Sequence, residues 1–146
     1  RQSYSATLGV GAGCGPSQHL GRRGVQGDNR HMDIIRHKPG QILSSAVEYG
    51  NLVFVSGTIP DNPDADMRGQ TANILAKIDA VLAAAGTNKS KVLSANIWVT
   101  DIRNRDAMNE AWIAWIDPAN PPARATVEAK LADPRWLVEI SVIAAK

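Results

Sequence analysis

The segment between Asp66 and Gly86 constrains the fold of this chain most, because its apolar residues recur every three or four positions. That spacing predicts a helix with one apolar face, formed by Ile74, Ile78, Val81, Leu82 and Ala85. Asp66 is suited to cap the first turn, and Gly86 is suited to end the helix. Such a helix has to bury its apolar face against another layer of structure.

Segments with strand character precede this helix. The predicted extended segments are residues 33–36, 42–49 and 52–55. Gly50-Asn51 joins the second to the third and is a hairpin signal. The third ends at Ser56-Gly57, where glycine permits a bulge or a close backbone approach. Residues 59–66 contain two prolines and three aspartates, which predicts a loop before the helix.

The pattern after the helix predicts further elements of both kinds. Residues 92–100 read as a strand, and residues 103–115 as a second helix whose apolar stripe contains Trp112 and Trp115. Three prolines between 118 and 122 exclude more helix and lead into two extended segments, 123–131 and 137–145. The order predicts a single α+β domain, a six-stranded mixed sheet with two helices on one face.

Residues 1–31 show neither helical nor strand periodicity and are rich in Gly, Ser, Gln and Arg. We expect them to be an appendage, and we place the domain at residues 32–146. His31-Met32 resembles a cloning junction, which favours that interpretation over a transit peptide. No apolar core of a secretory signal is present in the segment.

Composition excludes several classes of protein. No apolar run has the length of a membrane span, and a net charge of +2 does not by itself indicate a nucleic-acid surface, so neither partner is expected. A single cysteine, Cys14, allows no intrachain disulfide and favours a reducing, cytoplasmic location. The three histidines lack ligand spacing, so no metal site is expected.

Two charged residues, Arg124 and Glu139, interrupt the apolar strand segments near the end of the chain. A buried charge without a partner costs several kcal/mol, so each must face solvent, pair, or await a ligand. A guanidinium grips a carboxylate through two parallel hydrogen bonds. The alternatives are an ion pair of Arg124 with Glu128 or Glu139, and an edge-strand charge at Glu139 that discourages aggregation.

Five stretches of the chain together resemble the Rid family of reactive intermediate deaminases, also called YjgF or L-PSP. They are LVFVSGTIP (52–60), QTANILAKIDAVLAAAG (70–86), IWVTDIRNRDAMNEAW (97–112), PARATV (122–127) and VEI (138–140). The resemblance covers Met32 to Lys146. It implies a chorismate-mutase-like fold, a homotrimer with ligand clefts between subunits, and cofactor-free hydrolysis of imines and enamines. Substrates of that kind are 2-aminoacrylate, 2-iminopropanoate and 2-iminobutanoate, which give 2-keto acids and ammonia.

The resemblance also implies roles for individual residues. Arg124 would bind the substrate carboxylate, and Glu139 would orient the attacking water. The other implied contacts are Ser56, Gly57, Asn109 and Thr126, with Leu43 at a position where the best-studied deaminases carry tyrosine. Structural readings stay open for Asn109 as a surface or interface amide, for Ser56-Gly57 as a strand end, and for Trp112 and Trp115 as core or subunit contact.

Two other functional classes compete with the deaminase. A binding module, either a sensor or a holdase, would hold a small carboxylate without turning it over, and Leu43 keeps that alternative open. A ribonuclease or translation inhibitor has thin support, because the chain shows no histidine pair for RNA cleavage and its basic residues are scattered.

There is also a physical reason to expect a homotrimer. A sheet with both helices on one face leaves its other face uncovered, and packing three sheets around an axis would bury it. The two-residue period of a strand places Val138 and Ile140 on one face and Glu139 and Ser141 on the other.

Overall fold

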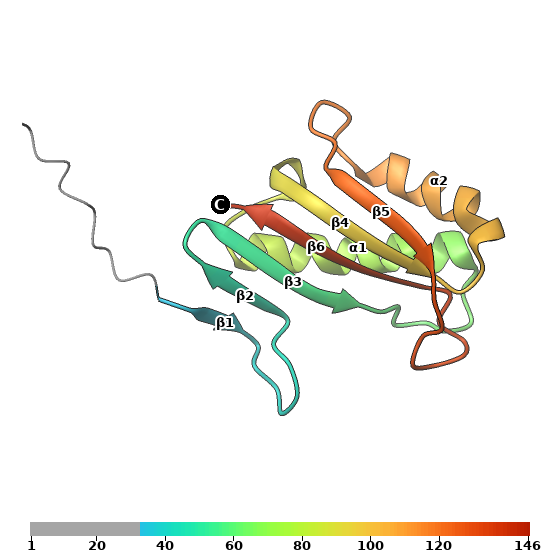
Figure 1. The fold of residues 1–146 in the computed structure, drawn as a ribbon, viewed down its shortest axis with the longest axis horizontal. Coiled ribbons are helices and arrows are strands. Elements are labelled where there is room, and N and C mark those ends of the chain that lie inside the picture. The colour runs from blue at the N-terminus through green and yellow to red at the C-terminus, as the bar shows by residue number, and fades with distance from the viewer. Residues whose placement is uncertain (1–32) are drawn as a thin grey trace, which may run out of the picture. The chain divides into compact units, whose positions relative to one another are not determined.

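A computed structural model of the chain describes residues 33–146, so the predicted appendage at residues 1–31 lies outside the described residues. The strands are β1 (Ile35–His37), β2 (Ala46–Tyr49), β3 (Leu52–Thr58), β4 (Val92–Val99), β5 (Ala123–Glu128) and β6 (Val138–Ala145). The helices are α1 (Met67–Ala84) and α2 (Arg105–Trp115), with short 3-10 helices η1 (Lys89–Lys91) and η2 (Ile102–Asn104) before β4 and α2. Both long helices lie on the same face of the sheet (Figure 1).

The six strands form one mixed sheet in the order β1-β2-β3-β6-β4-β5. Only β4 and β5 are parallel, and every other neighbouring pair is antiparallel. The predicted α+β class, with six strands and two helices on one face, is confirmed. The order puts the last strand, β6, between β3 and β4, while β5 forms an edge of the sheet beside α2 (Figure 1). Arg124 therefore lies on an edge strand, and Glu139 on an inner one.

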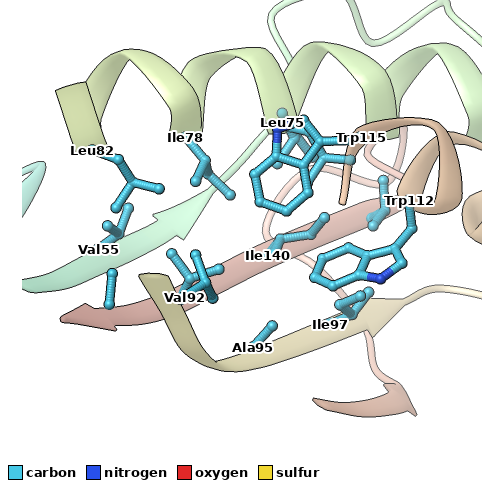
Figure 2. Close-up of a cluster of buried hydrophobic side chains, with 14 of the residues drawn as sticks. Val55, Leu75, Ile78, Leu82, Val92, Ala95, Ile97, Trp112, Trp115 and Ile140 are labelled. Carbon is cyan, nitrogen blue, oxygen red and sulfur yellow. The ribbon is translucent and has the colours of Figure 1, made fainter. Parts of the chain in front are cut away.

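The core lies between the helices and the sheet (Figure 2). Helix α1 buries the predicted stripe almost completely, with Ile74, Ile78 and Leu82 fully inaccessible to solvent. Asp66 caps this helix through its carboxylate, which accepts a hydrogen bond from the Gly69 amide at 2.8 Å. Gly86 follows the helix with a φ of 77°, a conformation that strongly favours glycine. Both sequence signals for the ends of this helix are thus confirmed.

Three predicted strands have wrong bounds. Strand β3 does not end at Ser56-Gly57 but continues through an irregularity there to Thr58, and β5 ends at Glu128 rather than at residue 131. The third is too long at its start. Residues 42–45 lie in the loop between β1 and β2, and β2 begins only at Ala46. Ile42 and Leu43, which suggested a strand, are 92% and 61% exposed. The loop contains a turn in which the Gly40 amide donates to the Leu43 carbonyl at 2.8 Å, and Pro39 cannot donate to a ladder at all. The hairpin predicted at Gly50-Asn51 does form, with a φ of 58° at Gly50.

Within residues 33–146, no helix lies on the sheet face opposite α1 and α2, which we call the uncovered face (Figure 1). Along β6, fully buried residues alternate with half-buried ones, as the strand period predicts, so Glu139 belongs to the uncovered face. Apolar side chains share that face, with Phe54 of β3 at 41% exposure and Val127 of β5 at 49%. A single chain thus leaves large apolar groups in water on one side.

A buried carboxylate fastens the β1-β2 edge to the end of β6. Glu48 has a side-chain exposure of only 7%, and its two oxygens accept hydrogen bonds from Lys146 Nζ and His37 Nε2, each at 2.6 Å. The Lys146 hydrogen bond is the main cause that holds the pKa of Glu48 below its ordinary 4.5, and the His37 hydrogen bond comes next. Since the folded pKa is lower than the unfolded one, this stabilisation is full above the unfolded pKa. It is lost as the pH falls through the folded value.

Glu48→Gln is therefore expected to lower the free energy of unfolding at pH 7 by about 1–3 kcal/mol, because two charge-assisted hydrogen bonds lose their acceptor charge. Urea unfolding of the variant and the parent protein at pH 7 and at pH 3 measures the effect. The difference should shrink at the lower pH, because there the carboxyl takes up a proton in the unfolded chain more readily than in the folded protein. An equal difference at both pH values would contradict this assignment.

Candidate functional site

The guanidinium of Arg124 is held by two side chains of α2. Arg124 pairs with Ala95 of β4, which is buried under the helices, so the arginine lies on the helix face of the sheet. Its Nη1 donates a hydrogen bond to Asn109 Oδ1 at 2.8 Å. Its Cζ lies 5.2 Å from the ring centroid of Trp112, which is a cation–π contact. The helix therefore orients the arginine without neutralising its charge.

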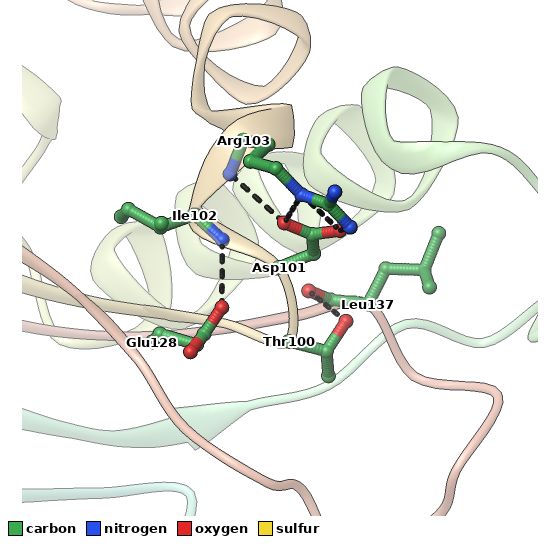
Figure 3. A network of polar contacts seen from close by, with 6 residues as sticks. All are labelled: Thr100, Asp101, Ile102, Arg103, Glu128 and Leu137. Carbon is green, nitrogen blue, oxygen red and sulfur yellow. Dashed lines mark hydrogen bonds and ion pairs between the residues drawn. The ribbon is translucent and has the colours of Figure 1, made fainter.

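No carboxylate among residues 33–146 lies within ion-pair distance of Arg124. Glu128 instead accepts a hydrogen bond from the Ile102 amide at 3.2 Å, and Arg103 is held by Asp101 (Figure 3). Partial burial lowers the pKa of Arg124, and the nearby charge of Arg105 lowers it further. Neither structural ion pair considered for Arg124 forms, so within the described chain its charge is available to an anion.

Glu139 and Gly57 lie together on the uncovered face of the sheet. A β-carbon placed on Gly57 would fall well inside van der Waals contact of Glu139 Oε1, so the carboxylate occupies the space that any other residue would fill. This is the close approach that the Ser56-Gly57 pair suggested. No donor within the described residues forms a hydrogen bond with the Glu139 carboxylate, which leaves it open to solvent or to a ligand.

Ser56 and Leu43 belong to the same region as Gly57. The Ser56 hydroxyl donates to the Ser44 carbonyl at 2.5 Å, which fastens β3 to the loop that carries Leu43. Leu43 itself is mostly exposed. Its side chain would form an apolar wall where a tyrosine would present a hydroxyl.

Thr126 shares the helix face of β5 with Arg124, two residues further along the strand. Its hydroxyl is buried and has no hydrogen-bond partner among residues 33–146. A buried hydroxyl without a partner is costly, so this group can gain from any acceptor brought close to β5.

The predicted site residues therefore form two separate groups. Arg124, Asn109 and Thr126 lie at the β5 edge on the helix side, and we call this the edge group. Ser56, Gly57 and Glu139 lie around β3 and β6, with the Glu139 carboxylate on the uncovered side, and we call this the face group. Strand β4 separates β5 from β6, and Arg124 and Glu139 point to opposite faces. In the part of the chain that the structure describes, a single copy does not bring both charges to one small molecule.

Two residues near Arg124 did not stand out as site residues in the sequence. Trp112 was assigned to the core or to a subunit contact, and it is buried, but it also supports the guanidinium. Arg105 adds a second positive charge nearby. Both residues could have been identified from their spacing to Asn109, because residues 105, 109 and 112 lie on one face of a helix.

The close contact at Gly57 yields a prediction that separates function from stability. Gly57→Ala is expected to displace the Glu139 carboxylate, because the new methyl group takes its place, while the flexible glutamate can swing into solvent at little cost in folding. Any activity that needs Glu139 should fall about tenfold or more, with a melting temperature close to that of the parent. Turnover assays beside thermal unfolding check this prediction. Unchanged turnover would show that the position of this carboxylate does not matter.

Within the described residues, no helix is both long and apolar enough to cross a lipid bilayer.

Residues 36–146 match the protein family described as Endoribonuclease L-PSP. A RutC family protein from Haemophilus influenzae is 43% identical over 114 residues, which cover 77% of this chain and 98% of that protein. RutC family protein YoaB from Escherichia coli K12 is 44% identical over 114 residues, covering 78% and 99%. A solved member of the YjgF protein family from Neisseria meningitidis has a TM-score of 0.77 at 43% identity and covers 80% of this chain and 97% of that one.

Proposed function

Since the chain belongs to the Endoribonuclease L-PSP family, whose relatives are described as RutC and YjgF proteins, we propose that it hydrolyses reactive 2-imino acids to 2-keto acids and ammonia. The observation that carries the proposal is the guanidinium of Arg124. It is oriented by Asn109 and Trp112 and meets no carboxylate among the described residues. An oriented and unneutralised guanidinium is suited to bind a small carboxylate through two hydrogen bonds.

The proposal requires that the two groups come from different chains. Three copies around a rotation axis would bring the edge group of one chain to the face group of the next, in a closed head-to-tail arrangement. The apolar side chains Phe54 and Val127 on the uncovered face support such packing, because it would remove them from water. The substrate would then bind in a cleft between two subunits.

The proposed chemistry needs positioning and proton transfer only. The imine carbon is already electrophilic, and Arg124 would hold the neighbouring carboxylate. As water adds to that carbon, Glu139 takes a proton from the water, and the electron pair of the C=N bond moves to the nitrogen. The nitrogen takes up both protons of the water: Glu139 returns the first, and the new hydroxyl group gives up the second as the carbonyl forms and the C–N bond breaks to release ammonia. The Gly57 amide would add a fixed hydrogen bond.

The test is to generate 2-aminoacrylate in situ and to follow the release of 2-keto acid with and without the protein. Accelerated release supports the deaminase. Binding of 2-oxobutyrate without acceleration would support a sensor or holdase instead. RNA cleavage that persists through a second chromatographic purification, in a preparation with no acceleration, would support a ribonuclease, the activity named in the family description.

A further inference from the structure

Arg105 lies on the same face of α2 as the residues that hold Arg124. Residues 105, 109 and 112 are spaced four and three apart, which places them on one side of the helix. Asn109 and Trp112 both contact Arg124 directly, so this side of α2 faces the edge group. Arg105 therefore extends toward the same region, one helical turn from Asn109, and its charge is close enough to lower the pKa of Arg124.

The two arginines form a positive region that the described chain does not balance. Both side chains are exposed, and neither has a carboxylate within ion-pair distance among residues 33–146. Among the other arginines of residues 33–146, Arg68, Arg103 and Arg135 each lie within ion-pair distance of a carboxylate in that range, and Arg36 does not. Two like charges close together repel each other. A ligand that brings two negative charges would relieve that repulsion.

Arg105 lies where two helices join, because it caps η2 and begins α2. The dipole of η2 favours a positive charge there and that of α2 disfavours it, so the helix dipoles do not by themselves account for this arginine. No ion pair within the described residues accounts for it either. Binding of an anion would account for it.

We propose that Arg105 selects dicarboxylic substrates, so that this protein acts on 2-imino acids of four or five carbons with a second carboxylate at the far end. Arg124 would bind the carboxylate beside the imine, and Arg105 would bind the distal one. The inference rests on the proposed function, and it narrows the substrate class without changing the reaction.

The experiment compares the affinities of the chain of residues 1–146 for 2-oxoglutarate and 2-oxobutyrate, the diacid and monoacid products, by titration calorimetry. The parent protein should bind 2-oxoglutarate about tenfold to a hundredfold more tightly, the range expected for one added charge-assisted hydrogen-bond pair. Arg105→Gln should remove most of that preference, chiefly by weakening the diacid. Arg105→Lys should restore part of it. Arg103→Gln, two residues away and paired with Asp101, is the matched control and should keep the preference.

Each outcome decides a different claim. Equal affinity of the parent protein for both acids, or an Arg105→Gln variant that keeps the preference, would overturn the role of Arg105. A diacid preference that depends on Arg105, in a protein that does not accelerate hydrolysis of either imine, would support the ligand class and overturn the deaminase. Binding of neither acid would overturn the proposed ligand class, and the turnover assay on 2-aminoacrylate would then decide the deaminase separately.

Discussion

Arg124→Gln is expected to lower kcat/KM for 2-iminopropanoate hydrolysis about a hundredfold to a thousandfold. The variant loses the positive charge and the pair of parallel hydrogen bonds to the substrate carboxylate. Glutamine keeps one donor and some length, so the effect measures the guanidinium rather than the space it fills. The measurement is the rate of keto-acid release at several substrate concentrations. Arg124→Lys should fall between the parent and the glutamine variant, because it keeps the charge but not the planar pair of donors.

The control for this prediction lies close by. Arg103→Gln removes an exposed arginine that is already paired with Asp101, and it should leave turnover within about twofold of the parent. Thermal unfolding of all variants separates lost function from lost folding, and Arg124 is exposed enough that its variants should fold. A glutamine variant with parental kcat/KM would remove the central support for the deaminase.

Much of the fold could be predicted because its main signals are local. The stripe of α1, its Asp66 cap and the glycine that follows depend on neighbours within one or two turns. The error at residues 42–45 has the opposite origin. Ile42 and Leu43 are apolar, but the turn between Gly40 and Leu43 fixes them in a loop, and their high exposure cannot be read from residue type.

The candidate site was predictable in its residues but not in its arrangement. Charges within apolar strand segments indicated Arg124 and Glu139. Their opposite orientation depends on β4 lying between β5 and β6, and strand order follows from tertiary packing rather than from local pattern. The cation–π contact between Trp112 and Arg124 could not be predicted for the same reason, because it depends on the placement of α2 beside β5.

The separation of the two groups makes the assembly testable by mixing inactive subunits. Glu139→Gln and Arg124→Gln are each expected to reduce turnover strongly when prepared alone. In the proposed trimer, each site takes the edge group from one chain and the face group from the next. In a random one-to-one mixture, a site is intact only when the Glu139 variant, whose Arg124 is unchanged, supplies the edge group. The Arg124 variant, whose Glu139 is unchanged, must then supply the face group. That combination occurs with a probability of about one quarter.

Co-expression of the two variants should therefore restore about one quarter of parental turnover, from a starting level near zero. The matched control is a mixture of Arg124→Gln and Asn109→Ala, because both changes lie in the edge group. Every edge group in that mixture carries one defect, so no site gains a complete set and turnover should not exceed the average of the two variants. If the first mixture also fails to recover while light scattering shows trimers, the two groups do not share a site. Monomers in light scattering would remove the intersubunit cleft, and with it the only way in which this geometry lets Arg124 and Glu139 meet the same substrate.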